Sequence, residues 1–194
     1  MPKVPLPTGE EPPKGYESLM TAKPNDDGVS VDCVFISQLA QIEYAEIEAM
    51  RKLAFVGIDT LVGLTNDVIS FEREINILPG KENSDKLLFR AHIGKVLTGY
   101  ALVVMGWPQK DSWVIQHLVI NPEYRLKGVG SSIVARIENF AIRSEVEAAR
   151  IYAIPLEESG EQFWKRLGYT VETARLPLKT TELDHELVLF RKEL

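Results

Sequence analysis

Two glycines one residue apart, Gly128 and Gly130, stand between a hydrophobic run and a stretch with helical spacing of its apolar residues. Two cations, Arg125 and Lys127, come just before them. The first amides of a helix have no partner within it, and the helix macrodipole places about half a positive charge there. Glycine lets a phosphate approach the backbone without meeting a Cβ atom. Residues 121–132 therefore have the features of a phosphate-binding turn, although the glycines alone would favour the alternative, an ordinary turn and helix start.

Two common glycine loops do not fit this stretch. The P-loop pattern is absent because no Lys-Ser/Thr pair follows Gly130. The dinucleotide pattern G-x-G-x-x-G also fails, because Ile133 stands where its third glycine belongs. The sequence thus argues against a nucleoside triphosphate enzyme and against a dinucleotide-binding loop.

The flanks of the glycines carry a resemblance. The segment "VINPEY" runs into Arg125-x-x-Gly128-x-Gly130, and further along the chain stands "FWKRLGY" (163–169). These segments resemble the acyl-CoA signature (Arg/Gln)-x-x-Gly-x-(Gly/Ala) and the Phe-Tyr-x-x-x-Gly-Phe helix of the GNAT superfamily of N-acyltransferases. The resemblance extends over about 85–180, with "FRAHIGKVLTGYALV" similar to the second and third strands of that family.

The resemblance implies an acyl-CoA-dependent N-acyltransferase of the EC 2.3.1 class. Such an enzyme transfers the acetyl group of acetyl-CoA, or the acyl group of another acyl-CoA, to a primary amine of a small molecule or peptide by direct attack. It further implies that the pantetheine arm pairs with one strand, one of whose amides faces the acetyl carbonyl as an oxyanion donor. The implied cofactor-binding residues are Leu118, Val119 and Ile120 for the pantetheine, and Arg125, Leu126, Lys127, Gly128, Val129, Gly130 and Ser131 for the pyrophosphate.

Two positions depart from the family pattern. Many members have a tyrosine that protonates the CoA sulfur, and Trp164 stands there; an asparagine that helps bind CoA is matched by Glu157. Deprotonating an amine with a pKa of about 10.4 at pH 7 costs roughly 4.6 kcal/mol, whereas protonating a thiolate matters by only about 2 kcal/mol. A missing acid is therefore tolerable, and Glu157 and Trp164 remain expected contacts of CoA.

The base that removes the amine proton is less well defined. Gln116 and His117 are the polar residues of the strand expected near the reacting carbonyl, and histidine has a suitable pKa. Tyr152 stands where some family members place a catalytic glutamate. We predict His117 and Tyr152 as the catalytic residues. The alternatives are a histidine on the other face of the sheet and a tyrosine packed in the core.

The order of elements predicts a mixed α/β domain over residues 29–194, preceded by an arm, residues 1–28, that holds six prolines. By resemblance, the fold is GNAT-like, with a mostly antiparallel central sheet flanked by helices. The loop 55–66 would shape the acceptor site, and its apolar character hints at a non-polar or large acceptor. The expected elements are a short strand at 17–22, helices over 37–55 and after Thr65–Asp67, a hairpin of strands 86–93 and 96–105, a strand at 112–120, a helix from the glycines to about Ser144, a strand at 150–154, a short helix closed by Gly168, and strands at 169–174 and 185–194.

Composition narrows the function classes. The 194 residues carry a net charge of −6, which argues against binding to nucleic acid. One cysteine allows no internal disulfide, the start has no apolar signal region, and no membrane-spanning run is present, so we expect a cytoplasmic protein. Three dispersed histidines offer no metal-ligand spacing, and we expect no metal. The oligomeric state is open, with a homodimer among the alternatives, as is a second hypothesis: an acyl-CoA-binding regulatory or partner-binding protein with little catalysis.

Overall fold

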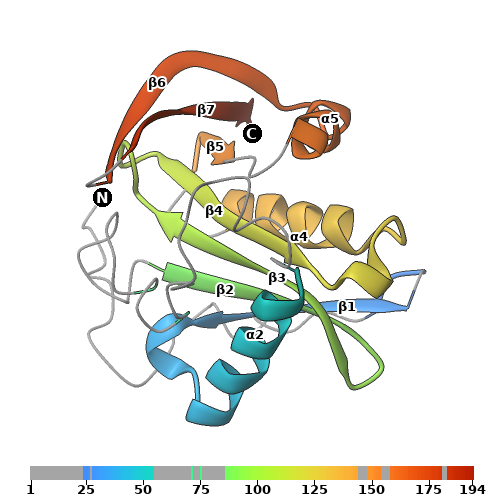
Figure 1. Cartoon of the computed structure of the whole chain (residues 1–194). Coiled ribbons are helices and arrows are strands. Elements are labelled where there is room, and N and C mark those ends of the chain that lie inside the picture. The colour runs from blue at the N-terminus through green and yellow to red at the C-terminus, as the bar shows by residue number, and fades with distance from the viewer. Residues whose placement is uncertain are drawn as a thin grey trace, which may run out of the picture.

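The computed structural model describes residues 24–26, 28–54, 71, 75, 86–143, 148–153, 158–180 and 183–194. Across these residues runs a seven-stranded sheet in the order β1-β2-β3-β4-β5-β7-β6, in which the β4–β5 pair is parallel and the other pairs are antiparallel (Figure 1). The elements are β1 (Val29–Phe35), η1 (Ile36–Gln38), α2 (Gln41–Ala54), β2 (Lys86–Ile93), β3 (Val96–Met105), β4 (Ser112–Ile120), η3 (Pro122–Tyr124), α4 (Val129–Arg143), β5 (Arg150–Ala153), α5 (Glu158–Arg166), β6 (Thr170–Thr180) and β7 (Leu183–Glu193). The predicted mixed, mostly antiparallel fold is confirmed.

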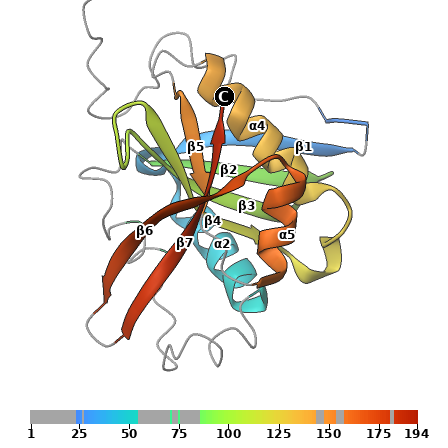
Figure 2. The ribbon, with the colours of Figure 1, turned by 90° about the horizontal axis from the view of Figure 1, so that it is seen from above.

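Helices cover both faces of the sheet. α4 lies on one face and α2 on the other, as the two views in Figures 1 and 2 show. Side chains alternate along a strand, so each strand sends residues into both layers. The α4-side cluster includes Phe89, Trp113, Ile137 and Phe140, and the α2-side cluster includes Ile47, Met50, Leu102 and Val119.

The strand β1 was not predicted, and this is a correction to the expected order. In "VSVDCVF" every second residue, from Val29 to Phe35, is buried, and the residues between them are half-buried. Each buried residue joins the α4-side cluster. β1 forms one edge of the sheet and pairs antiparallel with β2.

The strands of the central hairpin and β4 have the predicted bounds, and the two-residue turn at Gly94 and Lys95 is present. The first helix begins later than predicted, at Gln41, after the short helix η1. The last two strands are longer than predicted. The strand at 17–22 lies outside the described residues. So does most of the helix after Thr65–Asp67, of which Phe71 and Ile75 are helical and buried.

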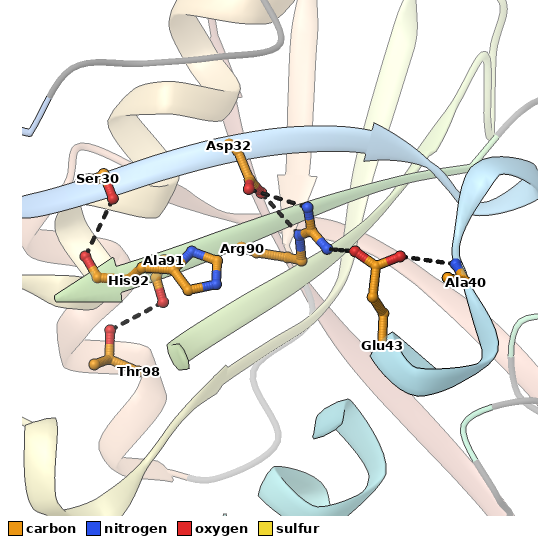
Figure 3. A network of polar contacts seen from close by, with 8 residues as sticks. All are labelled: Ser30, Asp32, Ala40, Glu43, Arg90, Ala91, His92 and Thr98. Atoms are coloured by element: carbon orange, nitrogen blue, oxygen red, sulfur yellow. Dashed lines mark hydrogen bonds and ion pairs between the residues drawn. The ribbon is translucent and has the colours of Figure 1, made fainter. Parts of the chain in front are cut away.

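A polar network fixes the start of α2 against the sheet (Figure 3). Arg90 of β2 binds both carboxylate oxygens of Asp32 on β1, at 2.8 and 3.0 Å, and also binds Glu43 of α2. The second oxygen of Glu43 accepts the Ala40 N–H at 2.7 Å, as in half of a capping box. Partial burial raises the pKa of Glu43, but the Ala40 N–H and Arg90 outweigh it and lower that pKa overall. The network explains why the helix starts here.

None of the described helices combines the length and apolar character that crossing a membrane requires.

Candidate functional site

The turn between β4 and α4 has an unusual backbone. Leu126 has a φ of 62° and Gly128 a φ of 78°, both in the left-handed region. Glycine accepts this conformation, but for leucine it costs roughly 1–2 kcal/mol. The Leu126 side chain is fully exposed, at 101 %, so packing does not offset that cost. Left-handed residues in a tight turn direct successive amides to one side, which creates a concave site for anions.

The first turn of α4 adds further amides. The first hydrogen bond of this turn runs from the Ser132 N–H to the Gly128 carbonyl, at 2.9 Å. The amides of Val129, Gly130 and Ser131 therefore precede the intrahelical ladder. The Ser132 hydroxyl also donates to the Gly128 carbonyl, at 3.1 Å, and accepts the side-chain amide of Asn25, at 2.9 Å. The Ser132 hydroxyl thus links Gly128 of the turn to Asn25, which precedes β1.

The two glycines of the turn have different roles. Gly128 supplies the left-handed backbone. At Gly130 a Cβ atom would lie 3.3 Å from two ring atoms of Phe163 on α5. That ring packs edge-on against Trp164, with 5.1 Å between ring centroids. The second glycine therefore allows α5 to approach α4 closely.

The two cations before the glycines point to different partners. The Lys127 ammonium lies 5.2 Å from the centre of the Tyr124 ring, within the turn itself. The Arg125 guanidinium donates through Nη2 to the carbonyl of Ala54, the last residue of α2, at 3.4 Å. Of these two cations, only Arg125 therefore connects the turn to a distant element.

β4 contains a bulge at Gln116. Leu102 on β3 pairs with His117 and Val103 pairs with Ile115, so Gln116 is the additional residue. Pairing with β5 ends at Ile115 and Ala153, although β4 continues to Ile120. In the described part of the chain, residues 116–120 have no β5 partner. Their backbone groups on that side can pair with an extended ligand.

The predicted pantetheine residues occupy this unpaired end of β4. Val119 is buried in the α2-side cluster, while Leu118 and Ile120 pack against the α4-side cluster. Their side chains are thus engaged with the two layers. The backbone is what this segment offers to a ligand.

The bulge sets the direction of His117. Its partner Leu102 and the next residue but one, Val119, both belong to the α2-side cluster, so His117 faces α2. Burial, and to a smaller degree the charge of Arg51, lower the pKa of His117 to about 3. The imidazole is neutral at physiological pH. Beside it, the side-chain oxygen of Gln116 is buried and has no hydrogen-bond partner.

The other predicted catalytic residue, Tyr152, is buried on β5 opposite Val114 and packs in a small cluster with Leu189 and Trp107. Val114 precedes His117 by three residues, which corresponds to roughly 10 Å along a strand. The structure thus places Tyr152 on the same sheet face as His117, but in a separate cluster.

Trp164 and Glu157 are the two positions that depart from the expected motif. Trp164 is 3 % exposed and lies in the α4-side core, edge-on to Phe163 and Tyr169. It is packed from both sides, which is how core tryptophans are held. Glu157 lies outside the described residues.

Two buried residues near His117 were not singled out in the sequence. Arg51 of α2 is 5 % exposed, and its guanidinium lies 5.9 Å from the centre of the Phe71 ring. Tyr100 of β3 is 1 % exposed, and burial raises its pKa. A signal existed for Arg51: Ile47 precedes it by four residues and Ala54 follows it by three, which is the spacing of one helix face. Within the described chain, no group of three or more His, Cys, Asp or Glu residues could hold a metal ion.

Comparison with known proteins gives a consistent result. A family model described as the acetyltransferase (GNAT) family matches residues 64–169, more than half of the chain. No curated protein sequence matches.

Three solved structures share the fold at low identity. An acetyltransferase from Thermus thermophilus is 14 % identical, with a TM-score of 0.61 over 84 % of this chain and 97 % of that one. The ribosomal-protein-S18-alanine N-acetyltransferase from Escherichia coli is 11 % identical, with a TM-score of 0.56 over 84 % and 93 %. Naa50 of Arabidopsis thaliana, in complex with the bisubstrate analogue CoA-Ac-MVNAL, is 14 % identical, with a TM-score of 0.54 over 86 % and 99 %.

Proposed function

Because the chain belongs to the GNAT acetyltransferase family, we propose that it transfers an acetyl group from acetyl-CoA to a primary amine of a small molecule or peptide by direct attack. The observation that carries the proposal is the unpaired end of β4 beside the left-handed turn and the first amides of α4. The two features suit the two halves of one elongated ligand: an extended arm and a pyrophosphate.

The donor end of this site is built mainly from backbone. The amides from Leu126 to Ser131 would hold the pyrophosphate, with charge from Arg125 and Lys127 nearby. Residues 118–120 would pair with the pantetheine as an added strand does. The residues present therefore fit CoA: the turn has the concave backbone that an anion needs, and β4 has backbone groups that β5 does not use. When bound, acetyl-CoA supplies the activated acetyl group.

The acceptor end would lie at the bulge. The buried oxygen of Gln116 can accept a hydrogen bond from an amine N–H, which aligns the nitrogen. The neutral imidazole of His117 is a second acceptor for the amine or for a water molecule. Its low pKa makes it a poor store for the proton, so the proton passes to solvent. Tyr152 remains a proposed contributor from β5.

The acceptor is proposed at the level of a primary amine. Two proteins of the same fold carry names or ligands that refer to protein or peptide amines, the S18-alanine N-acetyltransferase and Naa50 with its CoA-peptide analogue. These names support including peptide amines in a substrate panel. Because the identities are low, small amines belong in the same panel. We also propose that the protein is cytoplasmic and that Glu157 contacts CoA.

One substitution pair tests the donor site sharply. Ser131 is exposed and stands third in α4, so Ser131→Pro removes one proposed amide donor that has no partner within the helix. Ser131→Ala keeps the amide and is the control. A hydrogen bond to a charged group contributes about 1.5–3 kcal/mol. We expect calorimetry with CoA to show binding weakened by roughly 10- to 150-fold in the proline variant and nearly unchanged in the alanine variant.

Turnover tests the reaction. Release of free CoA from acetyl-CoA should depend on an amine from a panel of small amines and peptides. Absence of CoA binding by the unmodified chain would overturn the proposal.

A second candidate has one observation in its favour. Trp164, in the place of the family's acid, is packed in the core and offers no group that protonates a thiolate. The alternative is an acyl-CoA-binding regulatory or partner-binding protein with little catalysis. Tight CoA binding without turnover on any amine, in the unmodified chain and in His117 and Tyr152 variants alike, would favour it.

A further inference from the structure

Arg125 connects two faces of the sheet. It stands in the turn that leads to α4, yet its guanidinium reaches the carbonyl of Ala54, the last residue of α2. α2 lies on the opposite face of the sheet from α4 (Figure 1). The last carbonyls of a helix carry partial negative charge, and a cation there stabilises the helix by about 0.3–1 kcal/mol. Ala54 itself is buried. The contact therefore fixes a packed helix end.

The same end of α2 reaches the bulge of β4. Arg51 precedes Ala54 by three residues, so the two share one side of the helix. Arg51 is buried, lies over the Phe71 ring, and is close enough to His117 for its charge to affect that imidazole. Arg125 is thus hydrogen-bonded to the end of α2, and Arg51 on the same side of that helix acts on His117 through its charge.

We propose that Arg125 is a positioning residue that couples donor binding at the turn to acceptor binding at the bulge. The inference rests on the proposed function, because it takes the turn as the donor site. A guanidinium has five N–H donors in a planar fork, so it can hold the Ala54 carbonyl and a donor phosphate together. Ligand at the turn then restrains the last turn of α2, and with it Arg51 and His117.

Lys127 provides a matched control. It carries the same charge two residues further along the turn, but its partner is the Tyr124 ring within the turn. Removing Lys127 takes away charge near the pyrophosphate and leaves the contact with α2 in place. Removing a residue that only contacts the phosphate should therefore affect the kinetics differently from removing a residue that couples the two sites.

Steady-state kinetics with both substrates varied separates the two roles. Couplings between sites are typically 1–3 kcal/mol, or about 5- to 150-fold. We expect Arg125→Ala to raise KM for acetyl-CoA and to raise KM for the amine by about fivefold or more. Lys127→Ala should raise only the first. Arg125→Lys, which keeps the charge but lacks the fork, should restore much of the acetyl-CoA value and little of the amine value. An Arg125→Ala profile like that of Lys127→Ala, or a fall in kcat with both KM values unchanged, would overturn the coupling.

A spectroscopic readout keeps this test separate from turnover. The chain has three histidines, so the imidazole signals of His117 can be assigned by comparison with His117→Gln. Saturating CoA should shift the His117 signals in the unmodified chain and in Lys127→Ala, but not in Arg125→Ala. CoA binding without turnover would refute the proposed reaction and leave this shift measurable. An equal shift in Arg125→Ala and the unmodified chain would refute the coupling.

Discussion

Replacing Gln116 by leucine should make the protein more stable and less active. The side-chain oxygen of Gln116 is buried in the bulge of β4 and has no hydrogen-bond partner. An unsatisfied buried polar group costs about 1–3 kcal/mol of folding free energy. Leucine has a similar volume and no polar atom, so Gln116→Leu should recover much of that cost. For a chain of this size, that corresponds to an increase in Tm of roughly 2–10 °C.

The same change removes the proposed hydrogen bond to the acceptor amine. A bond of about 1.5–3 kcal/mol in the reacting complex corresponds to a loss of roughly 10- to 150-fold in kcat/KM. The opposite signs of the two effects make the prediction specific, because a substitution that merely disturbs the fold lowers both quantities. Stability and activity would trade against each other at one atom.

Thermal unfolding by circular dichroism and kcat/KM for one amine, measured on the same preparations, test the prediction. Gln109→Leu is the matched control, since the side-chain oxygen of Gln109 is exposed and accepts a hydrogen bond from Arg150 at 2.9 Å. That change should not raise Tm and should leave kcat/KM close to the unmodified value. A Gln116→Leu variant that unfolds at a lower temperature and turns over normally would show that the oxygen is satisfied in the native protein and has no role in the site.

Two further predictions concern His117 and Gly130. Because burial, and then Arg51, lower the pKa of His117 to about 3, the unfolded chain binds a proton between about pH 6.5 and pH 3 that the native chain does not. Stability from this residue is therefore complete above pH 6.5 and falls with decreasing pH by up to about 1.4 kcal/mol per unit. His117→Gln should reduce this slope in urea titrations at pH 5 and pH 7; equal slopes would contradict the lowered pKa of His117. Gly130→Ala places a Cβ atom 3.3 Å from two ring atoms of Phe163, so the ring must shift by a few tenths of an ångström; Phe163→Leu in the same chain should make the alanine substitution more favourable, whereas strict additivity of the two changes would contradict the contact.

The sequence predicts the central strands well because their signals are local. The turn at Gly94 and Lys95 fixes the register of β2 and β3, and apolar residues fill both strands. β1 carries an equally regular alternation, but it follows Gly28 directly and runs into Ile36 without a turn residue, so its limits are poorly marked. Its place at the edge of the sheet depends on pairing with β2, which lies more than fifty residues away.

In the site, too, the features with local signals are predicted and those that depend on packing are not. The turn and the start of α4 follow from the motif around Gly128. The bulge does not, because "SWVIQHLVI" reads as one continuous strand. A faint signal is present: Trp113 and Ile115 face the α4 side, and the next residues on that side are Leu118 and Ile120, so the alternation changes phase at Gln116. The burial of Arg51 is harder still to foresee, since charged residues on a helix are usually exposed and only packing against the sheet reverses this.

The pKa of His117 bears on which amine the proposed reaction would favour. Protonating an imidazole with a pKa of about 3 at pH 7 costs about 5 kcal/mol. Deprotonating a lysine-like amine into water at the same pH costs roughly 4.6 kcal/mol, so transfer of its proton to His117 brings no advantage over release to solvent. An α-amine has a pKa of about 7.7–8.0, and its deprotonation costs only about 1 kcal/mol. The proposed site, in which Gln116 and His117 orient the nitrogen without storing its proton, would therefore discriminate by the basicity of the amine itself and favour weakly basic amines over lysine side chains.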